Sequence, residues 1–396
     1  MFTDKQIFYQ MLAQTSASPM ALEISHADGV FLYGTDGRRY YDLISGVSVS
    51  NAGHNNAEIK AAIHEQVEKY THLMVYGEII QSPQVRYGEL LVSLLPAQLN
   101  NVYFVNSGSE ATDGAIKLAK RYTGRTEVIA YKNAYHGSSQ GSLSVLGHEE
   151  LKRAFRPLIP DVRFLKFNDG DDLASITEKT ACVIVEPVQG EAGIILPEEG
   201  YLQKLRERCN ETGALLVFDE IQTGICRTGR NFAFEHWDVT PDILVLAKAL
   251  GGGMPLGAFI SSKEIMQTLA YGPVLGHITT FGGHPVCCAA GMASLQYLLK
   301  NITNYDTENK AELFHSLLKD DIHVKSIRYK GLLMAIELGD ANKMHQFMKL
   351  GLEKGLVSDW FLFCDTAFRI SPPLTITAEE ISDVCRIIGE CLKEIR

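Results

Sequence analysis

The chain has 396 residues, of which 46% are hydrophobic and 21% are charged, proportions typical of a globular protein with a large buried core. Its formal net charge of −10 argues against a general affinity for nucleic acid or for anionic membranes. No apolar run approaches the roughly 20 residues of a membrane-spanning helix. The eight cysteines include no Cys-x-x-Cys pair, which indicates reduced, mostly buried thiols, and the first residues lack a secretory signal pattern. We therefore expect a cytoplasmic protein whose partners include neither nucleic acid nor a membrane.

The N-terminal part predicts a helix and a loop over residues 1–28, followed by a β-hairpin. The hairpin strands are expected at 30–33 and 38–42, because a glycine-rich turn separates two short apolar and aromatic runs. Two helices are predicted next, one starting near Ala57 and the other at 83–95.

From about residue 100 to residue 260, short apolar segments alternate with amphipathic helical patterns. This alternation predicts a doubly wound, largely parallel α/β sheet that binds its ligands at the carboxyl ends of the strands. Seven strands are predicted, at 102–105, 127–131, 162–166, 181–186, 214–219, 243–247 and 256–260.

After about residue 285 the pattern changes to long helices around a few strands, which predicts a second, smaller α+β domain. These helices are expected at 286–300, 307–319 and 377–394. We accordingly divide the chain into an N-terminal segment that joins the small domain, a large ligand-binding domain and a C-terminal small α+β domain. Their expected ranges are 1–50, 51–285 and 286–396.

The segment 241–253 predicts a buried strand that ends at Lys248 and is followed by three consecutive glycines. Burial in apolar surroundings lowers the pKa of a lysine and leaves a free amine that can attack a carbonyl group. A strand-end lysine that reaches solvent and does no chemistry is the alternative. The glycines do not follow the Gly-x-Gly-x-x-Gly spacing of a dinucleotide-binding loop.

An anion site is predicted where strand 102–105 continues through Ser107-Gly108-Ser109 into a helix. The unpaired amides and the dipole at a helix N-terminus favour an anion, above all a phosphate group. An ordinary N-cap serine is the alternative interpretation. Since the chain has no Walker pattern, the phosphate is not expected to belong to a P-loop nucleotide.

Two further strands end in acidic residues. Strand 214–219 ends at Asp219, where a carboxylate at the mouth of the sheet can hold a ring nitrogen in its protonated form. A helix N-cap explains Asp219 equally well. Strand 181–186 ends at Glu186, and the loop 279–285, rich in hydroxyl groups and glycine, precedes a helix.

Together these motifs place a buried amine, an anion-binding helix start and a ring-nitrogen acid at one edge of the predicted sheet. Pyridoxal phosphate (PLP) requires these three features, as a Schiff-base lysine, a phosphate site and a pyridinium partner. With these motifs the chain resembles a class III (ω-amino acid) PLP-dependent aminotransferase of fold type I, the group of ornithine, acetylornithine and 4-aminobutyrate aminotransferases. The resemblance extends from the hairpin at 30–42 to the segment Arg369–Leu374.

The resemblance implies a seven-stranded, mostly parallel sheet flanked by helices, and PLP as the cofactor. Lys248 would be the Schiff-base lysine, Tyr135 would stack on the ring, and Gln222 would contact its oxygen. Thr280 would bind the phosphate of the neighbouring subunit, which requires a homodimer with shared active sites. No metal is expected. The implied cofactor-binding residues are Gly108, Ser109, Tyr135, Glu186, Asp219, Gln222, Lys248 and Thr280.

The resemblance also implies transfer of an amino group from an ω-amino acid or related amine to 2-oxoglutarate. Arg369 would bind the α-carboxylate of glutamate, and Glu191 would cover this arginine while the other substrate is bound. Thr279 completes the expected substrate-binding residues.

Two positions depart from the family pattern. Ornithine and acetylornithine members usually carry an arginine directly after the position of Gly137, where it holds the distal carboxylate of the donor. Ser138 stands there in this chain, which weakens the case for those two donors. His284 replaces the asparagine of a Gly-Gly-Asn-Pro motif, and we interpret it as a tolerated change at a helix start.

Other functions remain as alternatives at the level of sequence. An aminomutase or a racemase on the same fold would transfer no amine to 2-oxoglutarate. Gly137-Ser138-Ser139-Gln140-Gly141 matches the Gly-x-Ser-x-Gly elbow of serine hydrolases, with Ser139 as the nucleophile. Five residues separate strand 127–131 from Gly137, however, whereas an elbow follows its strand directly.

Overall fold

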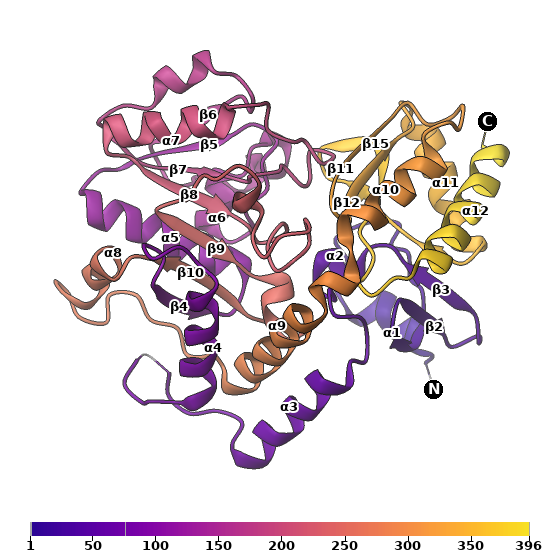
Figure 1. The fold of residues 1–396 in the computed structure, drawn as a ribbon, viewed down its shortest axis with the longest axis horizontal. Coiled ribbons are helices and arrows are strands. Elements are labelled where there is room, and N and C mark those ends of the chain that lie inside the picture. The colour runs from indigo at the N-terminus through magenta and orange to yellow at the C-terminus, as the bar shows by residue number, and fades with distance from the viewer. Residues whose placement is uncertain (1, 76, 396) are drawn as a thin grey trace.

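The computed structural model describes residues 2–75 and 77–395, so residue 76 and the two terminal residues lie outside it. Figure 1 shows a large part built around one central sheet and a smaller part that contains both chain termini. The helix α9 (Pro285–Tyr305) leads from the first part to the second.

The central sheet has seven strands in the order β4-β10-β9-β8-β7-β5-β6. Strand β10 runs antiparallel to both of its neighbours, and the remaining neighbouring pairs are parallel. The strands are β4 (Asn101–Val105), β5 (Glu127–Tyr131), β6 (Val162–Leu165), β7 (Thr180–Val185), β8 (Leu215–Asp219), β9 (Ile243–Leu246) and β10 (Gly257–Ser261). The seven predicted strands and the predicted fold class are therefore confirmed.

Both faces of this sheet are buried, which explains why its central strands are apolar throughout. Helix α5 (Gly108–Thr123) packs on the face that carries Val217 and Val245. Phe218, the next residue of β8, points to the opposite face and joins the core that contains helix α7 (Tyr201–Thr212).

The smaller part contains two four-stranded sheets. The first consists of β1 (Ile24–Asp28), β2 (Phe31–Gly34), β3 (Arg39–Asp42) and β13 (Leu356–Val357). The second, which is antiparallel, consists of β11 (Ser326–Lys330), β12 (Leu333–Glu337), β14 (Trp360–Phe361) and β15 (Cys364–Ile370). Because β3 pairs in parallel with β13, the N-terminal segment and the C-terminal part share a sheet. The division of the chain into three ranges stays a prediction.

The helices predicted from the sequence are also present. The remaining helices are α1 (Asp4–Met11), α2 (Ser45–Ser48), α3 (Ala57–Lys69), α4 (Ser82–Ser93), α6 (Gln140–Val145), α8 (Lys263–Gln267), α10 (Thr307–Leu318), α11 (Ala341–Glu353) and α12 (Ala378–Glu394). Short 3₁₀ helices lie at Glu149–Leu151, Arg153–Phe155, Asp171–Ser175, Ala233–His236, Lys248–Gly251 and Thr268–Ala270. Across residues 2–75 and 77–395, none of the helices has the length and apolarity needed to cross a membrane.

One prediction for the N-terminal segment was wrong. The residues before the hairpin were expected to form a loop, but β1 (Ile24–Asp28) pairs antiparallel with β2. Four of its five side chains are exposed, so the strand lacks the alternation of apolar and polar residues that identifies a half-buried strand.

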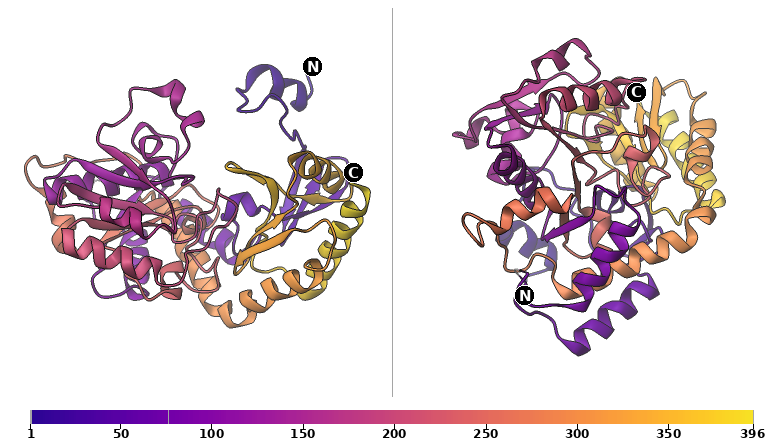
Figure 2. Two further views of the ribbon diagram at one scale, coloured as in Figure 1. Left: turned by 90° about the horizontal axis from the view of Figure 1, so that it is seen from above. Right: turned by 60° about the vertical axis from the view of Figure 1, so that its left-hand side comes forward.

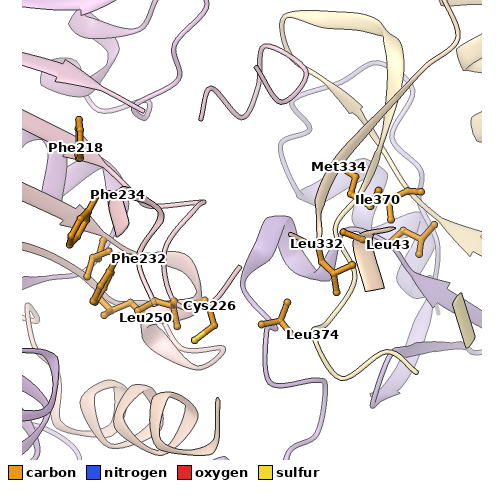
Figure 3. Close-up of a cluster of buried hydrophobic side chains, with 14 of the residues drawn as sticks. Leu43, Phe218, Cys226, Phe232, Phe234, Leu250, Leu332, Met334, Ile370 and Leu374 are labelled. Carbon is orange, nitrogen blue, oxygen red and sulfur yellow. The ribbon is translucent and has the colours of Figure 1, made fainter. Parts of the chain in front are cut away.

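An apolar core continues from the large part into the small one. Figure 3 shows Phe218, Phe234 and Leu250 on the sheet side and Met334 and Ile370 on the side of the small part, all within one buried cluster. The eight cysteines are free and seven of them are buried, as expected. The shared core fixes the position of β15, the strand that carries Arg369, relative to the carboxyl ends of the central strands.

Candidate active site

The carboxyl ends of β4, β8 and β9 surround a cavity of about 520 Å³. It lies where the doubly wound fold predicts a ligand site. Of the residues predicted to bind the cofactor, the cavity is lined by Gly108, Ser109, Tyr135, Glu186, Asp219, Gln222 and Lys248.

Lys248 follows β9 at the start of a 3₁₀ helix and has a φ angle of 50°. A left-handed backbone is strained for any residue other than glycine, and such strain is concentrated at functional sites. Burial lowers the pKa of the Lys248 amine, while the charges of Glu191 and Asp219 act in the opposite direction. The structure thus provides an amine that loses its proton more readily than an ordinary lysine.

Asp219 ends β8 and is buried. Its Oδ1 accepts a hydrogen bond from the Ile221 amide at 3.0 Å, and its Oδ2 lies 2.7 Å from Nδ1 of His136. The carboxylate is therefore held from two sides, and its orientation in the cavity is fixed. His136, whose side chain is completely buried, was not singled out in the sequence, because an isolated histidine in a loop carries no pattern.

The anion site is formed by the N-terminus of α5. The side chain of Ser107 caps the helix by accepting a hydrogen bond from the Glu110 amide at 3.2 Å. The first amides of a helix have no intrahelical partner, and those of Gly108 and Ser109 belong to residues that line the cavity. Gly137 packs against Ser109 with a φ angle of 126°, and any Cβ there would collide with the serine side chain.

The cavity is closed by loops that follow β5 and β7. Glu186 is buried, and its two carboxylate oxygens accept hydrogen bonds from the amides of Tyr135 at 2.9 Å and Gly190 at 2.8 Å. Burial raises the pKa of Glu186 to about 7. Nε2 of Gln222 is buried and makes no hydrogen bond with any residue that the structure describes. The glutamate therefore ties two loops together, and the glutamine offers a donor to a bound group.

A second cavity of about 490 Å³ adjoins the first, since Lys248 and Tyr135 line both. Its lining also includes Glu191, Asp359 and Arg369. Nη2 of Arg369 lies 2.8 Å from Oε1 of Glu191, so the predicted pair meets. Burial alone would lower the pKa of Arg369, but the charges of Glu191 and Asp359 outweigh it and raise the pKa.

Asp359 is a site residue that the sequence did not reveal. Its Oδ1 accepts a hydrogen bond from Nε of Arg369 at 2.9 Å. The segment around it carries neither a motif nor a glycine signal, and its position depends on the pairing of β14 with β15, which a local pattern does not show.

Thr279 and Thr280 are not among the residues that line the two cavities of their own chain. Oγ1 of Thr279 accepts a hydrogen bond from Asn106 at 2.8 Å, and Thr279 borders a separate groove. Thr280 is exposed. Their roles in binding stay predictions that depend on a second subunit.

Ser139 does not have the geometry of a hydrolase nucleophile. Its Oγ bonds to Asp113 at 2.9 Å and lies 3.0 Å from Ser142 Oγ, and its backbone is extended, with φ −71° and ψ 160°. An elbow serine sits on a strained turn beside a histidine base. His284 stands at the N-cap position of α9 without a side-chain capping bond and stacks on His72 with ring centroids 5.5 Å apart, which agrees with a tolerated change at a helix start.

Comparisons with known proteins identify the family. The family model of the class III aminotransferases matches residues 12–392. The acetylornithine aminotransferase of Methanopyrus kandleri is 38% identical over 371 residues, which cover 92% of this chain and 93% of that protein. The acetylornithine aminotransferase of Methanocaldococcus jannaschii is 38% identical over 380 residues, covering 93% of this chain and 92% of that protein.

Among solved structures, an ornithine aminotransferase from Toxoplasma gondii has a TM-score of 0.90 at 29% identity. The match covers 98% of this chain and 93% of that chain, and PLP partially occupies its active site. The chain belongs to the class III aminotransferases, a family of PLP-dependent enzymes, and the resemblance inferred from the sequence is confirmed.

The residues in the first cavity fit PLP. The donor Nε2 of Gln222 is buried without a partner, and the carboxylate of Asp219 is fixed in the same cavity. A Cβ on Gly108 would lie only 2.8 Å from Ile221 Cδ1, so the helix start packs closely beneath the cavity. The cavity therefore brings together the groups that PLP requires: an amine, an acid, an amide donor and a helix N-terminus.

Proposed function

We propose that the chain transfers the amino group of an ω-amino acid or related amine to 2-oxoglutarate. The observation that carries this proposal is the buried pair of Glu191 and Arg369 in the cavity that Lys248 lines. A reaction with two unlike substrates requires a site that binds an α-carboxylate in one half-reaction and none in the other.

PLP, when bound, supplies an aldehyde that accepts the amino group and a ring that withdraws electrons from the reacting carbon. Lys248 would hold the cofactor and then carry the proton to and from the reacting carbon, for which a lowered pKa suits its amine. Asp219, oriented by His136, would keep the ring nitrogen protonated. The N-terminus of α5, with Ser109, would bind the phosphate group.

Arg369 and Glu191 would separate the two half-reactions. An ω-amine donor presents only a methylene group at this place and would leave Nη2 of the buried guanidinium without a carboxylate, which is costly for a buried charge. Glu191 removes this cost by pairing with Arg369 at 2.8 Å. In the acceptor half-reaction the α-carboxylate of 2-oxoglutarate would replace Glu191, since a guanidinium grips a carboxylate with two parallel hydrogen bonds.

Replacing Arg369 by alanine tests this proposal. The rate of the 2-oxoglutarate half-reaction is expected to fall about 100-fold or more, because a charge-assisted, two-bond contact is lost. The half-reaction with the ω-amine donor is expected to change much less. Stopped-flow absorbance measures each half-reaction separately, and Arg206→Ala, which removes a part-buried ion pair to Asp242 outside the two cavities, is the control. Equal losses in both half-reactions would contradict the assignment.

The donor is best found by a screen. The two acetylornithine aminotransferases at 38% identity favour acetylornithine, whereas Ser138 stands where such enzymes usually carry an arginine for the distal carboxylate. Ornithine, acetylornithine, other ω-amino acids and diamines should each be tested with 2-oxoglutarate, with glutamate formation as the readout. Turnover of a donor without any oxo acid would instead indicate an aminomutase or a racemase.

We also propose a homodimer in which Thr280 completes the site of the partner, in a reducing, cytoplasmic compartment that suits eight free thiols. Large apolar side chains are exposed on the segment before this threonine and on the segment before α4, where His72 contacts the ring of Phe281. They include Ile80, 92% exposed, Tyr271, 71% exposed, and Val274. Helix α1 buries none of its residues and stands apart from the rest of the chain in Figure 2, as expected for an arm that packs on a second subunit.

A further inference from the structure

Arg369 is bound by two carboxylates from different parts of the chain. Glu191 takes Nη2 at 2.8 Å, and Asp359 takes Nε at 2.9 Å. The third nitrogen, Nη1, is buried and makes no hydrogen bond with residues 2–75 or 77–395. The arginine side chain is 1% exposed, so its positive charge has to be balanced by carboxylates inside the cavity, from the protein or from a substrate.

Asp359 is attached to the strand that carries the arginine. The Arg369 amide donates to the Asp359 carbonyl at 2.9 Å, and the hydroxyl of Ser358 donates to the Arg369 carbonyl at 2.6 Å. The next residues along the chain, β14, pair antiparallel with β15, and the Phe361 ring lies 4.6 Å from the guanidinium carbon. The main chain of Asp359 is therefore fixed beside that of Arg369, and its carboxylate stays within reach of Nε.

Glu191 reaches the arginine from a separate segment, the turn between Gln189 and Ile195. Its carbonyl accepts a hydrogen bond from the Phe363 amide at 3.0 Å, and its second carboxylate oxygen accepts one from the Leu362 amide at 3.2 Å. Its carboxylate can withdraw from Arg369 without unpairing a strand of either sheet. Asp359 thus belongs to the same hairpin as the arginine, whereas Glu191 comes from a separate turn and has the longer side chain.

The difference matters at the moment when the two half-reactions alternate. If Glu191 were the only counterion, the buried Arg369 would have none after Glu191 has withdrawn and before an α-carboxylate arrives. Asp359 remains in place at that moment and still holds Nε. The guanidinium then keeps its plane, with Nη1 and Nη2 available for the incoming carboxylate.

We propose that Asp359 is a fixed second counterion and a positioning residue for Arg369, which keeps the arginine compensated and oriented through both half-reactions. This inference rests on the proposed function, because it requires Arg369 to exchange Glu191 for a substrate carboxylate. It also predicts that Glu191 alone does not neutralise the arginine in the donor half-reaction.

A double-variant cycle tests the shared compensation. Glu191→Gln and Asp359→Asn each remove one charge but keep an oxygen that accepts a hydrogen bond. In the ω-amine half-reaction, each single variant is expected to lose no more than about threefold, because the other carboxylate still compensates Arg369. The double variant is expected to lose about 30-fold or more, beyond the product of the two single losses.

Binding of glutarate, an unreactive dicarboxylate, provides a second readout by calorimetry. Removal of both charges is expected to tighten glutarate binding, because the arginine then lacks an internal anion, while the donor half-reaction weakens. Asp359→Ala is expected to weaken glutarate binding about tenfold by releasing Nε, and Asp359→Asn is expected to restore it. Asp365→Asn, at an exposed position of the same hairpin, is the matched control.

Losses that simply multiply in the double variant, or glutarate binding that weakens in every variant, would overturn the role of Asp359 and indicate a structural ion pair. Circular dichroism and thermal midpoints of each variant separate misfolding from these outcomes. If the wild-type enzyme binds no glutarate and does not use 2-oxoglutarate with any donor, the proposed function itself fails. If it uses 2-oxoglutarate but the cycle is additive, only the inference about Asp359 fails.

Discussion

At the scale of single residues, the chemistry of the site depends on how the fold changes the proton affinity of Lys248. The strand end and the 3₁₀ helix place this amine in a cavity, and burial lowers its pKa, although nearby carboxylates oppose the shift. An ammonium group cannot attack a carbonyl, so the reactive fraction of a lysine disappears as the pH falls through its pKa. A lowered pKa moves this loss to a lower pH and leaves more free amine near neutrality.

This shift is measurable in the cofactor-free protein. The rate at which an acylating reagent labels Lys248 is expected to reach half of its maximum at a pH below the value of about 10.4 for an ordinary lysine. Mass spectrometry of a tryptic digest follows Lys248 and the exposed Lys263 in the same sample, the second serving as the control. A midpoint for Lys248 at or above that of Lys263 would show that burial does not lower its pKa.

At the scale of elements, one buried side chain holds the large part of the chain to the small part. Arg227 is completely buried and donates from Nη1 to the carbonyls of Leu332 at 3.0 Å and Pro372 at 2.6 Å. Nη2 donates to the side chain of Ser45 in the N-terminal segment and to that of Asn51 directly after it. Three distant segments therefore depend on one guanidinium for hydrogen bonds that solvent does not replace.

Arg227→Ala is expected to destabilise the protein by about 3 kcal/mol or more, because each buried acceptor left without a donor costs roughly 1–3 kcal/mol. Arg163→Ala, which removes a half-exposed ion pair to Glu127, is expected to cost less than about 1 kcal/mol. Thermal unfolding of both variants at one pH gives the comparison. Similar midpoints for the two variants would contradict the role of Arg227.

The sequence predicted those elements whose own side chains are buried on both faces. Strands such as β8 and β9 are short, continuous apolar runs that end in a charged or small residue, so their bounds and the site residues Asp219 and Lys248 follow from a local pattern. Strand β1 is exposed and was missed for that reason. Asp359 was missed because its importance arises from strand pairing and from the distant Glu191, and neither is visible in a window of ten residues.

At the scale of the whole molecule, the predicted phosphate-binding role of Thr280 does not fit its position within a single chain. The family resemblance predicts that it binds a phosphate group, yet it is exposed and absent from the lining of the cavity around Lys248. The exposed apolar side chains of Ile80, Tyr271 and Val274 are the expected contact surface of a second copy. In a two-fold dimer, each copy would then supply Thr280 to the site that contains the other copy's Lys248.

This arrangement predicts that two damaged chains restore each other. Lys248→Ala removes the amine from its own site, and Thr280→Asp places a negative charge beside the phosphate of the partner's site, so each homodimer is expected to have little activity. A mixed dimer contains one site with both native residues and one site with neither. Random reassociation of equal amounts gives mixed dimers in half of the molecules, and the expected activity is about 25% of wild type.

The activity is measured after the two variants are mixed, and native mass spectrometry counts the mixed dimers. A mixture of Lys248→Ala with Lys248→Gln is the control that should stay inactive. Full activity of Thr280→Asp alone, or mixed dimers without activity, would mean that each chain builds its site unaided.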